Sequence, residues 1–87
     1  MEEFYTYIIY SEKKDIFYKG FSTNPYKRLE QHNLNEGRFT KDKGPWILVY
    51  LEKFPTKRQA LIRERKLKKY SKKQIKQLMN SSKNILK

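Results

Sequence analysis

The sequence predicts a small α+β domain in which helices flank a three-stranded antiparallel sheet, with the elements in the order ββαβαα. Its 87 residues suffice for one domain and not for two. Three segments rich in aromatic and β-branched residues, 4–10, 15–22 and 46–54, are the expected strands. Three further segments open with side chains that cap helix N-termini, and these are the expected helices.

The first two strands are expected to form a hairpin. Residues 4–10 are apolar or aromatic at almost every position, which predicts burial on both faces and a central place in the sheet. Residues 11–14 form a polar loop of four residues, a length common in hairpins. With that loop, Tyr7 lies directly opposite Tyr18, so that the two rings share one face of the sheet.

Capping patterns define the three helices. An Asn-Pro pair opens the first, over residues 24–33, because proline lacks an N–H that the first turn does not need. A Thr or Ser followed three residues later by Gln opens the second and third, over residues 56–69 and 71–79. We therefore expect residues 1–79 to form the domain and residues 80–87 to form a flexible C-terminal tail.

The charge of the chain points to a polyanionic partner. Lys and Arg number 21 against 9 Asp and Glu, a formal net charge of +12, which exceeds what solubility needs and opposes compaction by self-repulsion. Nucleic acid is the leading partner. A membrane surface is a poorer one, because the second helix scatters bases around nearly its whole circumference. The absence of cysteine and of a long apolar run fits a cytoplasmic protein.

Glu64 is out of place on its helix. It falls on the apolar stripe built by Ala60, Leu61 and Leu67. A carboxylate that faces inward costs several kcal/mol unless it is paired or binds a cation. Two interpretations follow, a salt bridge to a nearby arginine and a ligand of a divalent cation. The spacing alone leaves both open.

Two further pairs of side chains have both an ordinary and a chemical interpretation. Arg28 and His32 are four residues apart and lie on one face of the first helix. They suit a phosphate and a proton relay, or they are simply surface residues. Tyr7 and Tyr18 are either an aromatic cross-strand pair or two hydroxyls that face a site.

The whole set suits metal-assisted cleavage of a phosphodiester. A carboxylate holds a cation, an arginine neutralises charge on the phosphoryl oxygens, and a tyrosine oxygen helps to activate the nucleophile. Lys41 and Lys43 lie in a basic loop near this set, and Arg63 precedes Glu64. We expect these three basic residues to contact the nucleic acid.

The order of these motifs resembles the GIY-YIG nuclease superfamily. The chain has Tyr7-Ile8-Ile9, then Tyr18-Lys19-Gly20, then Arg28 and His32. The stretch NLNEGRFTKDKGPW and the Arg-Glu step at residues 63–64 are similar to its small, stand-alone bacterial members. The chain departs from the motif in two places, with Tyr5 where the first glycine stands and with Lys19 in place of an apolar residue.

The resemblance implies a role for each residue of the set. Tyr7 and Tyr18 would be the motif tyrosines, Arg28 the catalytic arginine, and Glu64 the single metal ligand, with His32 beside them as a further catalytic group. One divalent cation, Mg²⁺ or Mn²⁺, would bind together with the substrate. A downstream asparagine of some relatives has no secure counterpart in the expected tail.

The expected function is therefore that of a hydrolase, a divalent-metal-dependent endonuclease that acts on nucleic acid, with DNA favoured over RNA. The alternative is a non-catalytic basic module that binds DNA or RNA, which needs neither Glu64 nor a metal. The strandedness and sequence of the substrate, the oligomeric state and the biological pathway stay open.

Overall fold

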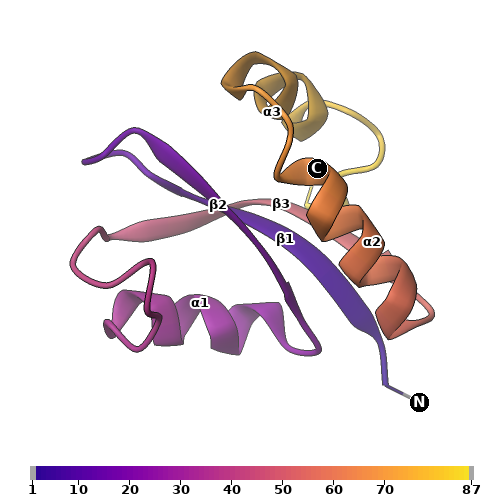
Figure 1. Cartoon of the computed structure of the whole chain (residues 1–87), viewed down its shortest axis with the longest axis horizontal. Coiled ribbons are helices and arrows are strands. Elements are labelled where there is room, and N and C mark those ends of the chain that lie inside the picture. The colour runs from indigo at the N-terminus through magenta and orange to yellow at the C-terminus, as the bar shows by residue number, and fades with distance from the viewer. Residues whose placement is uncertain (1, 87) are drawn as a thin grey trace.

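The fold expected from the sequence is confirmed in a computed structural model, which describes residues 2–86 (Figure 1). Its elements are β1 (Phe4–Ser11), β2 (Ile16–Ser22), α1 (Pro25–Asn33), β3 (Trp46–Phe54), α2 (Lys57–Leu67) and α3 (Lys72–Met79). The strands form one antiparallel sheet in the order β2-β1-β3. The first strand is therefore central, as its two apolar faces require.

Each face of the sheet carries its own core, and the helices divide between the faces (Figure 1). On one face Tyr7 and Ile9 pack with residues of β3 and with Leu29 of α1. On the other face Ile8 packs with Leu67 of α2 and with buried residues of α3. The alternation of side chains along β1 thus supplies both cores, because successive residues of a strand point to opposite faces.

The hairpin register differs from the expected one by two residues. Tyr7 lies opposite Gly20, and Tyr18 lies opposite Ile9. The loop has four residues as expected, but it spans residues 12–15, because Ser11 is buried in the strand and donates to the carbonyl of Lys43 at 2.5 Å. Tyr7 and Tyr18 are diagonal neighbours on one face, so the shared face is retained.

The helix starts are those that the capping patterns predict. The side chains of Asn24, Thr56 and Ser71 each accept a hydrogen bond from a backbone N–H in the first turn. Ser71 forms the full reciprocal capping box with Gln74. The second helix ends at Leu67, two residues before the expected end. In residues 2–86, every helix is too short or too polar to cross a bilayer.

The described part of the expected tail is tied to β3 instead. Asn84 is 6% exposed. Its Oδ1 accepts from the N–H of Leu51 at 3.2 Å, and its Nδ2 donates to the carbonyls of Val49 and Met79 at 3.0 and 2.9 Å. The N–H of Ile85 donates to the carbonyl of Leu51 at 2.9 Å. The segment thus covers the polar edge that β3 would otherwise expose.

We expect Asn84→Ala to lower the free energy of unfolding by about 2–3 kcal/mol, because it leaves the buried N–H of Leu51 and two carbonyls without this partner. Urea denaturation measures the change. The matched control is Lys83→Ala, at the exposed preceding position, which should have little effect. Equal and small effects of both substitutions would contradict the role assigned to Asn84.

Candidate active site

The ring of Tyr7 lies across β2 where the strand has no side chain. Tyr7 is 1% exposed and is paired with Gly20. A Cβ atom at position 20 would collide with Cζ and Oη of Tyr7. Gly20 is therefore required at this position by the close approach of the phenol, and the Tyr7 hydroxyl reaches over the edge strand of the sheet.

The hydroxyl of Tyr7 is hydrogen-bonded to α1 at that edge. Tyr7 Oη lies 2.9 Å from Nε2 of His32, and the other ring nitrogen, Nδ1, lies 2.6 Å from Oγ1 of Thr40. His32 is 1% exposed and Thr40 is fully buried. A Cβ atom at Gly37 would collide with Thr40 Oγ1, so the loop after α1 closes onto the imidazole only because residue 37 is glycine.

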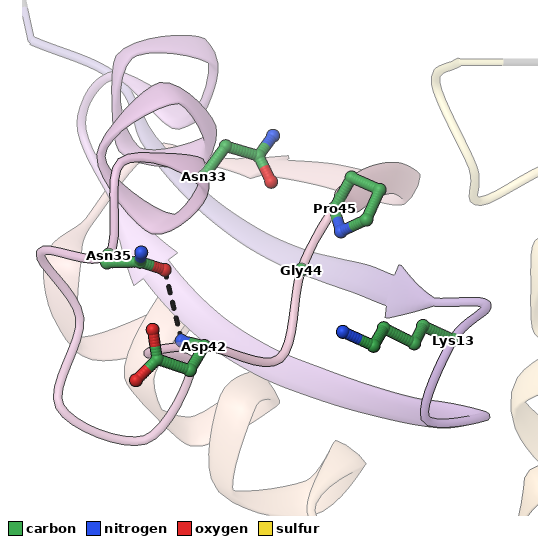
Figure 2. A pocket seen from close by; sticks show the side chains of 6 residues that line it. All are labelled: Lys13, Asn33, Asn35, Asp42, Gly44 and Pro45. Carbon is green, nitrogen blue, oxygen red and sulfur yellow. Dashed lines mark hydrogen bonds between the residues drawn. The ribbon is translucent and has the colours of Figure 1, made fainter.

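Thr40 and Gly37 did not emerge from the sequence as functional residues. They lie in a loop, where no periodic pattern shows which side chains point inward. Figure 2 shows how this loop is fixed at its base, where Asn35 Oδ1 accepts from the N–H of Asp42 at 3.0 Å. Asn33 also exchanges two hydrogen bonds with the backbone of Trp46. These contacts hold the two ends of the loop and so place Thr40 against His32.

Tyr18 and Phe39 form an aromatic ledge, a pair of stacked rings beside the imidazole. The Tyr18 ring meets His32 edge-on, with the centroids 5.2 Å apart. Phe39 stacks on Tyr18 at 5.6 Å and is 54% exposed. Lys43 Nζ lies 3.9 Å from the centroid of the Phe39 ring, a cation–π arrangement. The basic loop expected near the site is therefore in contact with it through Phe39 and Lys43, while Lys41 is exposed on the same loop.

Burial sets the protonation states of the Tyr7–His32 pair, and the charge of Arg28 modifies them. Burial raises the pKa of Tyr7 more than the charge of Arg28 lowers it, so Tyr7 is protonated at neutral pH. Burial, assisted by the charge of Arg28, lowers the pKa of His32 to about 4. At neutral pH the site therefore holds a neutral phenol hydrogen-bonded to a neutral imidazole.

Glu64 reaches the site from the other face of the sheet. Its carboxylate raises the pKa of Tyr7, which places the charge within electrostatic range of the hydroxyl. Its ion-pair partner is Lys68, at 3.6 Å and 58% exposed, while the Glu64 side chain is 18% exposed. The partner is therefore a lysine and not the arginine expected in one interpretation. An exposed lysine at this distance contributes little, which leaves the carboxylate able to bind a cation.

The donor set fits one kind of metal. Residues 2–86 contain no cluster of three or more His, Cys, Asp or Glu side chains that could hold an ion. Glu64 alone suits a hard cation that keeps several waters and takes its other ligands from substrate phosphate, which is the behaviour of Mg²⁺. Such an ion needs one or two protein carboxylates, and the site offers one.

Arg63 is held against β3, and its contact with nucleic acid stays a prediction. Its side chain is 12% exposed, and its Nε donates to Oε1 of Glu52 on β3 at 3.0 Å. Tyr50 also donates to that oxygen, at 2.5 Å. Successive residues of a helix project about 100° apart. Because Arg63 is held against β3, the next side chain, Glu64, projects in another direction, away from β3.

Two hollows lie beside these elements. One, of about 290 Å³, opens next to Tyr18 and is lined by Phe17, Tyr18, Lys19, Phe39 and Lys68. Burial lowers the pKa of Lys19 there. The other, of about 450 Å³, lies at the base of the loop after α1 and is lined by none of the predicted site residues (Figure 2). The aromatic and basic hollow is thus the one adjacent to the gathered side chains.

Comparison with known proteins shows which proteins the chain is similar to. The model of the GIY-YIG catalytic domain matches residues 3–80. A UPF0213 protein of Clostridium perfringens is 42% identical over 78 residues, which cover 88% of this chain and 83% of that protein. One of Staphylococcus haemolyticus is 37% identical over 75 residues, covering 85% and 90%.

A solved structure extends the similarity to the fold. The solution NMR structure of a UPF0213 protein from Bacillus halodurans is 27% identical, with a TM-score of 0.59, and the match covers 97% of this chain and 89% of that one. The resemblance seen in the sequence motifs is confirmed by these matches.

The buried imidazole should make stability depend on pH. Neutral His32 stabilises the fold fully above the unfolded pKa of 6.5, and this contribution declines as the pH falls toward the folded pKa of about 4. Between about pH 7.5 and about pH 5 the loss should be about 2 kcal/mol. The charged and titratable groups that face the ring are Tyr7, Tyr18 and Arg28.

Urea denaturation of the parent and of His32→Gln at both pH values measures this contribution. Carboxylates affect both proteins alike, so the difference between them isolates His32. Because the chain has a single histidine, an NMR titration gives its pKa directly. A pKa near 6.5, with the same pH dependence in both proteins, would contradict the burial of a neutral ring.

Proposed function

The chain belongs to the GIY-YIG catalytic-domain family, a family of nucleases, and we propose that it is a divalent-metal-dependent endonuclease that hydrolyses phosphodiester bonds in nucleic acid, with DNA favoured over RNA. One observation carries the proposal. The hydroxyl of Tyr7, hydrogen-bonded to His32, lies within reach of the charges of both Arg28 and Glu64. We infer that a proton-accepting pair, a phosphate-binding guanidinium and a metal-binding carboxylate lie together at this edge of the sheet.

The Tyr7–His32 pair supplies a path for the proton of an attacking water. Tyr7 is protonated, so its oxygen takes a proton from the water only if its own proton passes to His32 Nε2 at the same time. The free imidazole is a weak base, but a bound phosphate offsets the charge of Arg28 and raises the pKa of His32. Because His32 is buried, it returns the proton through the Tyr7 hydroxyl after hydrolysis.

The remaining groups bind the phosphoryl group. Arg28 offers a planar fork of donors to two phosphoryl oxygens, and its charge counts most as the phosphoryl group gains charge. Tyr18 packs against His32 and holds the ring in place beside the ledge formed with Phe39. A cation held by Glu64 would neutralise charge on the phosphoryl and leaving oxygens.

The surface around the site suits a nucleic acid strand. Lys41 and Lys43 lie on the loop beside the site, and Lys19 and Lys68 line the hollow next to Tyr18. Phe39 presents an exposed aromatic ring there, and bases stack on such rings whatever their identity. Together with the formal net charge of +12, these residues would bind the backbone on either side of the scissile phosphate.

Glu64→Gln should abolish cleavage and should preserve or tighten binding, because it removes the metal ligand together with a negative charge at the site. The measurements are single-turnover cleavage of labelled single- and double-stranded oligonucleotides with Mg²⁺ or Mn²⁺, and binding of the same oligonucleotides in the presence of a chelator. Glu36→Gln, at an exposed position, is the matched loss of charge and should retain activity.

Two outcomes bear on the proposal as a whole. Cleavage retained in Glu64→Gln would refute the assignment of the metal ligand. If the parent protein binds nucleic acid in a salt-dependent manner but does not cleave it whichever divalent cation is added, the nuclease proposal fails and the non-catalytic binding module takes its place.

Removing the hydroxyl of Tyr7 or Tyr18 should separate catalysis from stability. We expect Tyr7→Phe to lower the cleavage rate by about 10²-fold or more, while the free energy of unfolding falls by only about 1 kcal/mol, the usual net contribution of one hydrogen bond. Tyr18→Phe, measured in the same way, tests whether its hydroxyl also takes part.

The control is Tyr26→Phe, on the same helix as His32 and 61% exposed, which should change neither quantity. Cleavage at the parent rate by Tyr7→Phe would contradict the proton path.

A further inference from the structure

Thr40 is the partner of His32 on the side away from Tyr7. Thr40 Oγ1 lies 2.6 Å from Nδ1 while Tyr7 Oη lies 2.9 Å from Nε2, so both ring nitrogens are hydrogen-bonded. A neutral imidazole carries one proton, so it donates one of these bonds and accepts the other. Which nitrogen carries the proton decides whether Tyr7 can pass its own proton to His32.

The surroundings of Tyr7 indicate which group donates the hydrogen bond between Tyr7 and His32. The guanidinium of Arg28 has donors only, so it offers no acceptor for the Tyr7 proton. The proton of Tyr7, which is 1% exposed, then needs an acceptor of its own, and in residues 2–86 the described partner is His32 Nε2. If Nε2 carried a proton, the Tyr7 proton would have no acceptor among the described residues.

We propose that Thr40 is a positioning residue, whose hydroxyl oxygen accepts a hydrogen bond from Nδ1–H of His32 and so holds the ring in the tautomer that leaves Nε2 open to the Tyr7 proton. The fully buried side chain of Thr40, the close approach over Gly37 and the fixed base of the loop all keep this oxygen in place. The lowered pKa of His32 agrees with a neutral ring.

The tautomer stands on the hydrogen-bond geometry alone, whereas its catalytic value rests on the proposed function. The two are therefore tested by different measurements. The single histidine of the chain makes the first one direct, because one set of imidazole signals reports one ring.

The experiment is NMR of the ¹⁵N-labelled full chain near neutral pH, using the couplings between the ring nitrogens and the ring carbon-bound protons. We expect the protonated nitrogen in the parent to be Nδ1. A parent ring protonated at Nε2 would overturn the proposal, whether or not the protein cleaves nucleic acid.

Two substitutions at position 40 test the role of the hydroxyl. Thr40→Ser keeps the oxygen and should keep the tautomer. Thr40→Val removes it with little change of shape, and should shift the ring toward the Nε2–H form. Thr6→Val is the matched control, because Thr6 is also fully buried and donates its hydroxyl to the carbonyl of Ala60 at 2.6 Å, away from His32. An unchanged Nδ1–H ring in Thr40→Val would overturn the role of Thr40.

The rate of cleavage gives the second readout. Thr40→Val should lower the single-turnover rate by about tenfold or more, since a ring in the wrong tautomer cannot accept the Tyr7 proton. Thr40→Ser should cleave at a rate close to that of the parent. A tautomer shift without a change of rate would overturn the catalytic part of the proposal. If the parent protein cleaves nothing, the proposed nuclease activity fails, and the NMR result still decides the tautomer.

Discussion

The passage of the Tyr7 ring over Gly20 is the contact on which the rest of the site depends. A tyrosine in a central strand normally buries its ring among the neighbouring strands, but here the facing residue has no side chain. The ring therefore extends to the edge of the sheet, where its hydroxyl meets His32 of α1. Any larger residue at position 20 would occupy the space of the phenol.

The edge position lets both faces of the sheet contribute. Tyr7, Tyr18 and His32 belong to the face covered by α1, whereas Glu64 comes from α2 on the other face. The ion pair between Arg63 and Glu52 anchors one side of α2 to β3, and the geometry of the helix then directs Glu64 away from β3. In the proposed site, the Glu64 carboxylate and the neutral Tyr7–His32 pair can thus approach one phosphate from two sides without competing for the same space.

The sequence predicted what local patterns encode. The apolar faces of β1 and the capping side chains were sufficient for the element order and for the sheet, because burial and capping act over a few neighbouring residues. The candidate residues Tyr7, Tyr18, Arg28, His32 and Glu64 also appeared from their chemistry and their spacing, and the structure brings them to one edge.

The parts that the sequence did not reveal depend on contacts between distant segments. The predicted hairpin register was wrong by two residues because Ser11 donates a hydrogen bond to the carbonyl of Lys43, far along the chain. Arg63 was expected at the surface, in contact with nucleic acid, because no neighbouring residue in the sequence indicates its ion pair with Glu52. Thr40 and Asn84 lie in polar segments, and only the folded chain shows that each fills a buried hydrogen-bonding position.

A cation and a phosphodiester that meet at the β2 edge of the sheet would be detected most directly by paramagnetic broadening of the backbone amide signals by Mn²⁺. The spectra are recorded with an oligonucleotide and the slowly cleaving Tyr7→Phe variant. We expect the strongest broadening around Glu64 and Gly20, weak broadening around Asn84 at the β3 side, and loss of the pattern when Glu64→Gln is added. Broadening centred elsewhere, or unchanged by Glu64→Gln, would contradict this placement of the cation.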